Sequence, residues 1–529
     1  MGAGRSDESD AEVRPELADL RDRKALLGDE ARPDAVAKRH GSGRRTAREN
    51  LADLVDPGSF VEYGGLAIAA QRARREVREL LERTPADGLI AGTARINGDR
   101  FGDAAACAVL SYDYMVLAGT QGVFGHRKKD RLFELIERMR LPTVLFAEGG
   151  GGRPGDTDYP VVSGLDTRAF ALWARISGLA PRIAIVAGRC FAGNAVLAGS
   201  SDLIVATEDI ALGMGGPAMV AGGGLGEFAP EEIGPINVQA PNGVVDVRVA
   251  DEAAAVAATK RLLAYFQGPL EEWREPDPER VRTVVPESRR RAYDVHKAID
   301  ALVDGDSATY LRDGFARGMV TALARIEGRS VGIVANNPMQ MAGAITSEGA
   351  DKAARFMQLC DAFDLPIVFL CDTPGIMVGP EAETTALVRH AARMFVVGGS
   401  ISVPFCTVVL RKGYGLGAQA MAGGSFKAPL FTVAWPTGEF GGMGLEGAVR
   451  LGFRNELAAI ADEQERQALF EKMVARAYEI GKAVNVASHF EIDDVIDPAD
   501  SRRWIMTALR SVPPPPKRRR KKRPQVDTW

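Results

Sequence analysis

Residues 187–219, AGRCFAGNAVLAGSSDLIVATEDIALGMGGPAM, decide the fold, because a version of this stretch returns later in the chain at a constant distance. Gly193 reappears as Gly417 and Ser201 as Ser425, which is 224 residues further on in both cases (417 − 193). Glycines and small residues that recur at one spacing are typical of a repeated structural unit.

The same spacing holds upstream of this stretch. RLFELIERMRLP, which ends at Pro142, lies over RFMQLCDAFDLP, which ends at Pro366, with apolar residues on apolar residues. Only after Ser425 does the spacing grow, to 229, where Gly-Met-Gly at 213–215 meets the same triplet at 442–444. A match kept over roughly seventy positions indicates a duplicated domain.

Length and composition agree with two domains. The chain has 529 residues, of which 46% are hydrophobic, enough for two or more well-packed cores. The net charge is −4, but residues 517–529 carry seven basic residues and one Asp, so residues 1–516 carry −10. The body of the protein is therefore mildly acidic and its C-terminal tail strongly basic.

The cysteines and the N-terminus bear on location. Five cysteines are scattered without the spacing of a disulfide framework or a metal site, as in a reducing compartment. The first residues lack an apolar signal core, and no eighteen apolar residues run together. We expect a soluble, cytoplasmic protein without a membrane segment and without a metal.

Short apolar strands alternate with helices in both halves, which predicts an α/β fold. Each half has a Gly/Pro loop just after a strand: EGGGGRPGDTD at 148–158 and CDTPGIMVGPEAE at 371–383. Ligands of α/β sheets bind in such places. GGGRPGDT is not a nucleotide loop, because Asp156 stands where a lysine is required, and DTPG and GMGLEG lack the context that gives those motifs meaning.

The chemistry is predicted at the two glycine turns. RIAIVAG reads as a buried strand, and RCFAGNAVLAGSS then begins a helix whose first N–H groups have no intrahelical partner. Gly193 lets a ligand approach these donors, which can hold a developing oxyanion. CTVVLRKGYGLGAQAMAGGS at 406–425 repeats the arrangement. The alternative is that these glycines only allow tight packing of helix on strand.

Side-chain catalysts are not evident in the sequence. The five histidines are isolated, no HExxH motif occurs, and no GxSxG motif precedes a helix. Oxyanion holes without a nucleophile or a base suggest that a substrate or cofactor supplies the base.

Residues 46–510 resemble the carboxyltransferase (β) subunit of biotin-dependent acyl-CoA carboxylases, the acetyl-, propionyl- and methylcrotonyl-CoA carboxylase family. The motifs that carry the resemblance are DPGSF, AGTQGVFGHRKKD, AEGGGGRPGD, GRCFAGNAV, GMGGPAM, ANNPMQMAGAI, ADKAARFMQLCDAFDLPIVFLCDTPG and GGMGLEGAVRLGFRNEL.

The resemblance implies two tandem crotonase-like domains and transfer of a carboxyl group from carboxybiotin to the α-carbon, or the vinylogous position, of an acyl-CoA. Biotin would act as the base and would arrive on a partner (α) subunit or domain that carries the biotin carboxylase and the biotin carrier. It further implies a homo-oligomer, a hexamer, with active sites where the first lobe of one subunit meets the second lobe of another. Nucleic acid is not an expected partner.

Carried over to this sequence, the first oxyanion pair is Gly193 and Asn194, for the thioester enolate. The second pair, for the biotin ureido oxygen, is Leu416 and Gly417 in an ungapped match, or Gly417 and Ala418 by the internal repeat. Both readings stay open. The other implied contacts are Arg127 or Lys128 for a CoA phosphate, Gly151, Gly152, Phe191 and Ala192 for the substrate, Gln419 for acyl selection, and Gly415 with Gly417 for biotin.

Phe191 and Asn194 depart from the commonest family pattern, which has a second glycine at the latter position. Two alternatives therefore stay beside the carboxylase component: a biotin-dependent decarboxylase subunit running the transfer in reverse, and a catalytically inactive assembly subunit. The acyl group is left open by the sequence.

The expected domain limits follow the repeat. They are a disordered N-terminus at 1–14, an acyl-CoA domain at 15–274, a linker at 275–290, a biotin domain at 291–512 and a Pro/basic tail at 513–529. The tail begins with four prolines and continues with seven like charges, so we expect it not to pack on the core. Either it is a solvated, dispensable segment or it clasps an acidic partner.

Overall fold

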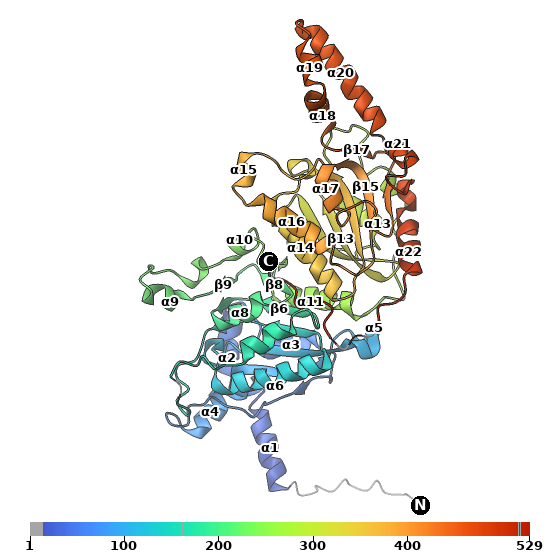
Figure 1. Ribbon diagram of the computed structural model, residues 1–529. Coiled ribbons are helices and arrows are strands. Elements are labelled where there is room, and N and C mark those ends of the chain that lie inside the picture. Colours follow the sequence, from blue (N-terminus) through green and yellow to red (C-terminus); the bar gives the residue numbers. More distant parts are fainter. Residues whose placement is uncertain (1–13, 161, 517, 519) are drawn as a thin grey trace, which may run out of the picture.

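Two lobes with matching β-sheets make up the protein, as a computed structural model shows (Figure 1). The structure describes residues 14–160, 162–516, 518 and 520–529. The predicted disorder of residues 1–14 falls almost wholly outside this range.

The first lobe contains a seven-stranded sheet in the order β1-β2-β3-β4-β6-β8-β10 and a small sheet in the order β5-β7-β9. Its strands are β1 (Val61–Glu62), β2 (Leu89–Arg95), β3 (Ala106–Tyr112), β4 (Thr143–Phe146), β5 (Gly149–Gly150), β6 (Arg182–Val186), β7 (Arg189–Phe191), β8 (Leu203–Thr207), β9 (Ala211–Gly213) and β10 (Val247–Val249). Its helices are α1 (Pro15–Ala25), α2 (Pro33–Gly41), α3 (Ala47–Leu54), α4 (Val77–Arg83), α5 (Gly98–Phe101), α6 (Val123–Met139), α7 (Ala169–Ile176), α8 (Gly193–Gly199), α9 (Pro217–Gly222), α10 (Ile236–Gln239) and α11 (Glu252–Gln267).

The second lobe has one larger sheet in the order β11-β12-β13-β14-β15-β16-β18, with β17 beside β15. Its strands are β11 (Thr309–Leu311), β12 (Met319–Ile326), β13 (Arg329–Asn336), β14 (Ile367–Thr373), β15 (Phe405–Tyr414), β16 (Thr432–Ala434), β17 (Glu439–Gly441) and β18 (Asp494–Val495). Its helices, after α12 (Glu279–Arg282), are α13 (His296–Leu302), α14 (Ser347–Ala362), α15 (Pro380–Glu383), α16 (Leu387–Gly398), α17 (Gly415–Ala420), α18 (Leu445–Gly452), α19 (Arg454–Ala458), α20 (Glu463–Ile480), α21 (Ala483–Ser488) and α22 (Ser501–Ser511).

The two sheets correspond strand for strand. In each, the first three strands are antiparallel neighbours and the remaining strands of the path are parallel. The β3–β4 register pairs Ala108 with Thr143, and the β13–β14 register pairs Gly332 with Ile367. Both residues are displaced by 224 (332 − 108 and 367 − 143). The predicted α/β duplication is thus present at the level of strand register.

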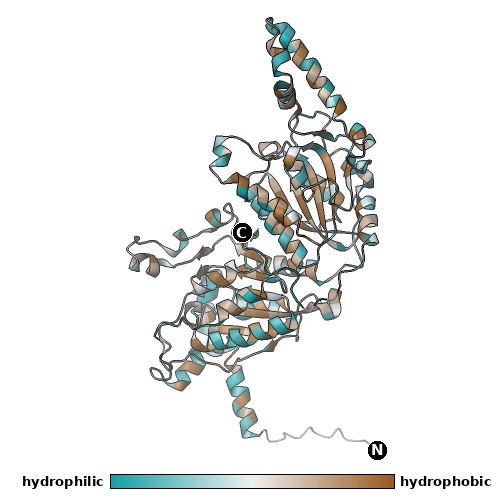
Figure 2. Ribbon diagram, in the orientation of Figure 1, coloured by the Kyte–Doolittle hydropathy of each residue, from teal (hydrophilic) through white to brown (hydrophobic). Residues whose placement is uncertain are grey.

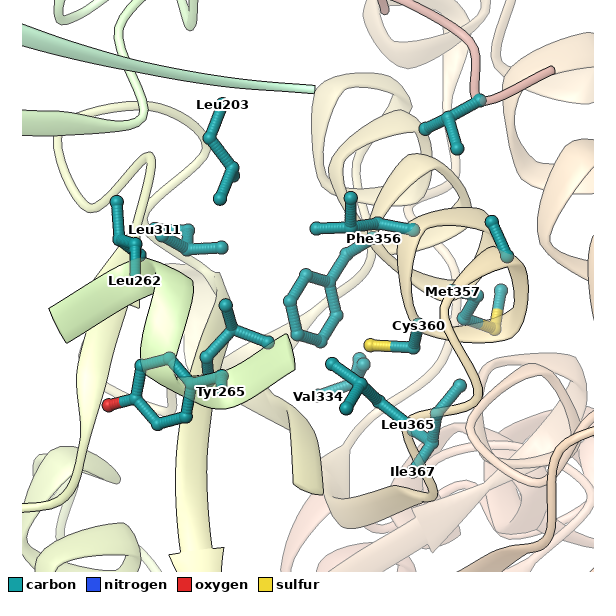
Figure 3. Packing of buried hydrophobic residues seen from close by; sticks show 14 of the residues in the cluster. Leu203, Leu262, Tyr265, Leu311, Val334, Phe356, Met357, Cys360, Leu365 and Ile367 are labelled. Carbon is teal, nitrogen blue, oxygen red and sulfur yellow. The ribbon is translucent and has the colours of Figure 1, made fainter. Parts of the chain in front are cut away.

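A continuous apolar core joins the lobes. Figure 3 shows Leu262 and Tyr265, from α11 of the first lobe, in the same cluster as Val334 and Phe356 of the second. Figure 2 shows apolar residues concentrated on the strands, with hydrophilic residues along α1. The segment proposed as a linker also packs, since Val281 of α12 is buried against the second lobe. The lobes are therefore not two beads on a string.

The prediction that the tail does not pack on the core is wrong. Val526 is buried, and its N–H donates to Ser177 Oγ of the first lobe (3.1 Å). The N–H of Asp527 donates to Gln358 Oε1 of α14 in the second lobe (3.0 Å). The tail fails to stay free because acidic residues of its own chain neutralise it: Lys522 and Arg523 pair with the buried Asp361 at 3.0 and 2.9 Å.

Candidate functional site

Two strand–turn–helix units occupy equivalent places in the lobes. In the first, β7 leads into α8; in the second, the end of β15 leads into α17 (Figure 1). β7 pairs with β9 so that Phe191 lies opposite Gly213, and β15 pairs with β17 so that Tyr414 lies opposite Gly441. Phe191 and Tyr414 are therefore equivalent residues.

The next residue has a positive φ in both turns, 51° at Ala192 and 56° at Gly415. This region is costly for alanine and easy for glycine, and such backbone strain is concentrated at functional sites. Continuing the register pairs Gly193 with Leu416, and Asn194 with Gly417.

Of the two readings of the second pair, the strand register favours Leu416 and Gly417 over Gly417 and Ala418. The offset is 223 here because the second lobe is one residue shorter between the two preceding strands. Thr143 lies opposite Arg182 in the first lobe, and Ile367 opposite Phe405 in the second. The same pairing places Gly213 over Gly441, so the offset of 229 expected for Gly442 is one residue too large.

The glycine-rich loop of the first lobe lies directly beside its turn. Gly150 of β5 pairs with Phe191, and a β-carbon built on Gly151 would be 3.5 Å from that of Ala192. Gly152 forms a parallel bridge with Gln121. The structure thus brings together the predicted residues Gly151, Gly152, Phe191, Ala192, Gly193 and Asn194.

An ion pair fixes the start of this loop. Arg39 of α2 donates to both carboxylate oxygens of Glu148, at 2.8 and 2.6 Å. Burial raises the pKa of Glu148, and the bidentate pair with Arg39 opposes that shift. The loop is therefore anchored to the N-terminal helices, whose part in the site the sequence did not reveal.

Asn194 is directed into the protein interior. Its side chain is fully buried; Nδ2 donates to the carbonyl of Glu148 (2.9 Å), and Oδ1 accepts from Gln121 Nε2 (2.6 Å). The larger residue in place of a glycine therefore braces the turn instead of filling the space in front of it.

The second turn is braced by main chain. A β-carbon on Gly417 would lie 2.6 Å from both Cα and C of Gly375, so only glycine fits. The strand-end acid equivalent to Glu148 is Asp372, which accepts from Arg411 Nε of the neighbouring strand (3.1 Å). Ala418 is buried, whereas Leu416 and Gln419 are exposed.

The proposed phosphate contacts differ in position. Lys128 is 8% exposed, and its ammonium donates to the carbonyls of Ala86 (3.0 Å) and Leu89. Burial lowers its pKa to about 8. Arg127 is exposed and stacks on Tyr159, with 4.8 Å from its guanidinium carbon to the ring centroid. Of the two, Arg127 has the accessible charge.

A basic cleft was not foreseen from the sequence. It encloses about 600 Å³ beside Ala118 and Glu148, and its cationic lining includes Lys38, Arg44 and Arg189. The signal in the sequence was the basic run RHGSGRRTAR at 39–48. In the part of the chain that the structure describes, no group of three or more His, Cys, Asp or Glu residues could hold a metal ion. No helix there is long and apolar enough to span a bilayer.

Comparison with known proteins identifies the class. The carboxyl transferase domain model matches residues 38–524. The chain is 33% identical to the methylmalonyl-CoA carboxyltransferase 12S subunit of Propionibacterium freudenreichii subsp. shermanii, over 90% of each chain. It is 32% identical to the biotin-dependent long chain acyl-coenzyme A carboxylase beta4 subunit of Mycobacterium tuberculosis, over 92% of each.

Two solved structures add to this. A single-chain, multi-domain long-chain acyl-CoA carboxylase aligns over 94% of this chain with TM-score 0.90 and 59% identity, and the chain spans about half (49%) of that protein. The transcarboxylase 12S hexamer with methylmalonyl-CoA bound aligns over 98% of this chain and 99% of that one, with TM-score 0.83 and 29% identity. The protein belongs to the carboxyl transferase family, and its lobes are crotonase-like domains. It is an enzyme, the carboxyltransferase component of a biotin-dependent acyl-CoA carboxylase.

Proposed function

We propose that this protein moves the carboxyl group of carboxybiotin, carried by a partner subunit or domain, to the α-carbon of a long-chain acyl-CoA. The observation that supports the acyl class is the 59% identity to a long-chain acyl-CoA carboxylase, against about 33% or less to the other relatives compared here. In this direction the product is a carboxyacyl-CoA, and the decarboxylase reading is the reverse of the same transfer.

On the acyl-CoA side, the N–H groups of Gly193 and Asn194 accept the developing negative charge of the thioester oxygen. Charge that appears only along the reaction path is stabilised best by fixed, water-excluded donors. Gly151 and Gly152, with Phe191 and Ala192, form the wall beside this turn. The cleft with Lys38 and Arg44 offers charges for the CoA phosphates, with Arg127 as a further candidate.

On the biotin side, the chain fits the cofactor at the second turn. The close approach of Gly417 to Gly375 leaves the N–H groups of Leu416 and Gly417 at a helix start without intervening side chains. Carboxybiotin, when bound, supplies the carboxyl group and the base that removes the α-proton. Gly415 gives the turn its positive φ, and the exposed Gln419 lies where it can contact the acyl chain.

A complete site takes one lobe from each of two copies. α8 and α17 belong to different lobes and lie apart in Figure 1. We therefore propose a homo-oligomer, a hexamer like the transcarboxylase 12S core, in which the first lobe of one copy faces the second lobe of its neighbour. The cytoplasmic location and the absence of a metal stay predictions.

The reverse reaction tests this proposal. Purified protein is given free biotin and a long-chain carboxyacyl-CoA without ATP or added metal, and decarboxylated acyl-CoA is measured. We expect turnover, with kcat/KM higher for a sixteen-carbon chain than for methylmalonyl-CoA. Preference for the short chain would contradict the long-chain assignment, and restoration by a divalent ion after chelation would contradict the metal-free reading.

Absence of transfer with every chain length would instead support the inactive assembly subunit. The direction is decided by the partner that co-purifies. A biotinylated chain with an ATP-binding carboxylase region supports carboxylation, whereas a membrane-bound sodium-pumping partner supports decarboxylation.

A further inference from the structure

Behind the first turn lies a row of three polar side chains that the function so far leaves unused. Lys129 and Gln121 come from α6 and the segment before it, and Asn194 from α8. Their exposed fractions are 0%, 5% and 0%. Buried polar side chains are costly unless they are mutually satisfied, so an ordered row needs a reason.

The hydrogen bonds of the row run in one direction. Lys129 Nζ donates to Gln121 Oε1 (2.7 Å), and Gln121 Nε2 donates to Asn194 Oδ1 (2.6 Å). Asn194 Nδ2 then donates to the carbonyls of Glu148 (2.9 Å) and Gly119 (3.3 Å). Because a lysine only donates and a carbonyl only accepts, each amide has one possible orientation.

The second lobe lacks this row. The residues equivalent to Gln121 and Lys129, 224 positions on, are Ile345 and Ala353, and the strand register places Gly417 over Asn194. The first equivalence is exact, since Gln121 bridges Gly152 just as Ile345 bridges Ile376. The second turn is held by main-chain contact at Gly417, so the row belongs to the acyl-CoA lobe alone.

We propose that Lys129, Gln121 and Asn194 are positioning residues that hold the first oxyanion turn in its working geometry, a task that backbone packing performs in the second lobe. The row ends on the residue whose own N–H faces the thioester oxygen. This inference rests on the proposed role of the first turn. An oxyanion donor displaced by a fraction of an ångström loses much of its effect.

The surroundings of Lys129 support a fixed, directional donor. Its ammonium lies 5.7 Å from the ring centroid of Tyr112 and 5.9 Å from that of Phe170. Burial lowers its pKa to about 7, and Asp130 and Asp87 oppose the shift. Aromatic walls on two sides leave Gln121 as its hydrogen-bond acceptor among the described residues.

Gln121→Glu tests the proposal with almost no change of shape. A carboxylate still accepts from Lys129, but it cannot donate to Asn194 Oδ1. Asn194 must then turn its amide, which places Oδ1 against the carbonyls of Glu148 and Gly119. We expect kcat for transfer from carboxyacyl-CoA to free biotin to fall by about 10²-fold, with KM for biotin unchanged.

The decisive measurement is the same substitution in an Asn194→Gly background. Asn194→Gly keeps the main-chain N–H but removes the end of the row, so Gln121→Glu should then change kcat by less than about threefold. Gln121→Met, which is uncharged and of similar shape, serves if the glutamate variant does not fold. An equal loss in both backgrounds would overturn the proposal.

Gln267→Glu is the matched control, because Gln267 is also a buried glutamine with hydrogen bonds at both ends, to Asn97 and Ile96 on α11. It should leave kcat within about threefold of the unmodified protein. If the unmodified protein shows no transfer, the proposed function fails. If it transfers and Gln121→Glu keeps full kcat, only the positioning role fails.

Discussion

The two lobes solve one problem in two ways. Each must hold a strained turn in front of a glycine loop that follows a strand-end acid. In the first lobe Glu148 is held by Arg39 from outside the sheet, and a side-chain row supports the turn. In the second, Asp372 is held by Arg411 of the adjacent strand, and Gly417 packs on the main chain of Gly375.

The difference shows that duplication preserved geometry more closely than it preserved chemistry. The turns keep their positive φ at Ala192 and Gly415 and their strand partners. What changed is the layer behind them, which does not touch the ligand. A side-chain layer tolerates a larger residue such as Asn194, whereas a main-chain layer does not.

The largest expected effect comes from adding one methyl group to each turn. Gly417→Ala places a carbon 2.6 Å from main-chain atoms that cannot turn aside, so the second oxyanion pair must shift. We expect transfer to fall by about 10²–10³. Gly193→Ala meets side-chain atoms instead, Gln121 Nε2 at 2.8 Å and Phe170 Cζ at 3.0 Å, and should cost about tenfold or less.

Steady-state kinetics with free biotin measure both variants, with Gly452→Ala on α18 as control, since nothing lies within 4 Å of a β-carbon there. Equal losses in the two lobes would contradict the distinction between side-chain and main-chain support. A well-folded Gly417→Ala protein with normal kcat would move the second oxyanion pair elsewhere.

A smaller effect is expected from removing the tail that joins the lobes. Deleting residues 513–529 exposes the surface under Val526 and leaves Asp361, which is 2% exposed, without Lys522 and Arg523. We expect a loss of at least about 2 kcal/mol, seen as a melting temperature lower by about 4–8 °C in scanning calorimetry.

Val526→Ala should reproduce part of this loss, and Arg520→Ser, at an exposed position of the same segment, should not. An unchanged melting temperature after deletion would restore the picture of a free tail. Separate unfolding of the two lobes in the truncated protein would show that the tail couples them.

The smallest effect concerns a pair of lysines that the duplication did preserve. Lys128 and Lys352, 224 residues apart, each donate to two carbonyls from the segment before the second strand of their sheet or its equivalent, Ala86 and Leu89 or Arg312 and Phe315. Burial lowers their pKa values to about 8 and about 7.

In the unfolded chain a lysine has a pKa of about 10.4, so above pH 7 the unfolded state binds more protons than the folded one. Stability contributed by Lys352 therefore rises as the pH increases from 7 to 8.5, by at most about 1.4 kcal/mol per pH unit. Denaturant unfolding of the unmodified protein and of Lys352→Met and Lys128→Met tests this. The Lys352→Met curve should rise less than that of the unmodified protein, and parallel curves would contradict the assignment.

The sequence by itself determined the duplication, the α/β class, the two glycine turns and the enzyme family. Positive φ at Gly415 and the close approach at Gly417 are local demands that only glycine meets, so they leave a readable pattern. Apolar periodicity and the 224-residue spacing are likewise properties of the linear chain.

Only the tertiary structure decided the register of the second turn, the fate of the basic residues and the support behind the first turn. A one-residue deletion between β14 and β15 becomes visible only when strands are paired. Charges such as Lys128 and Lys522 look alike in sequence whether they face solvent or a buried partner. Their environment is set by residues far away in the chain, such as Asp361 for the tail, and contacts of that kind leave no local pattern.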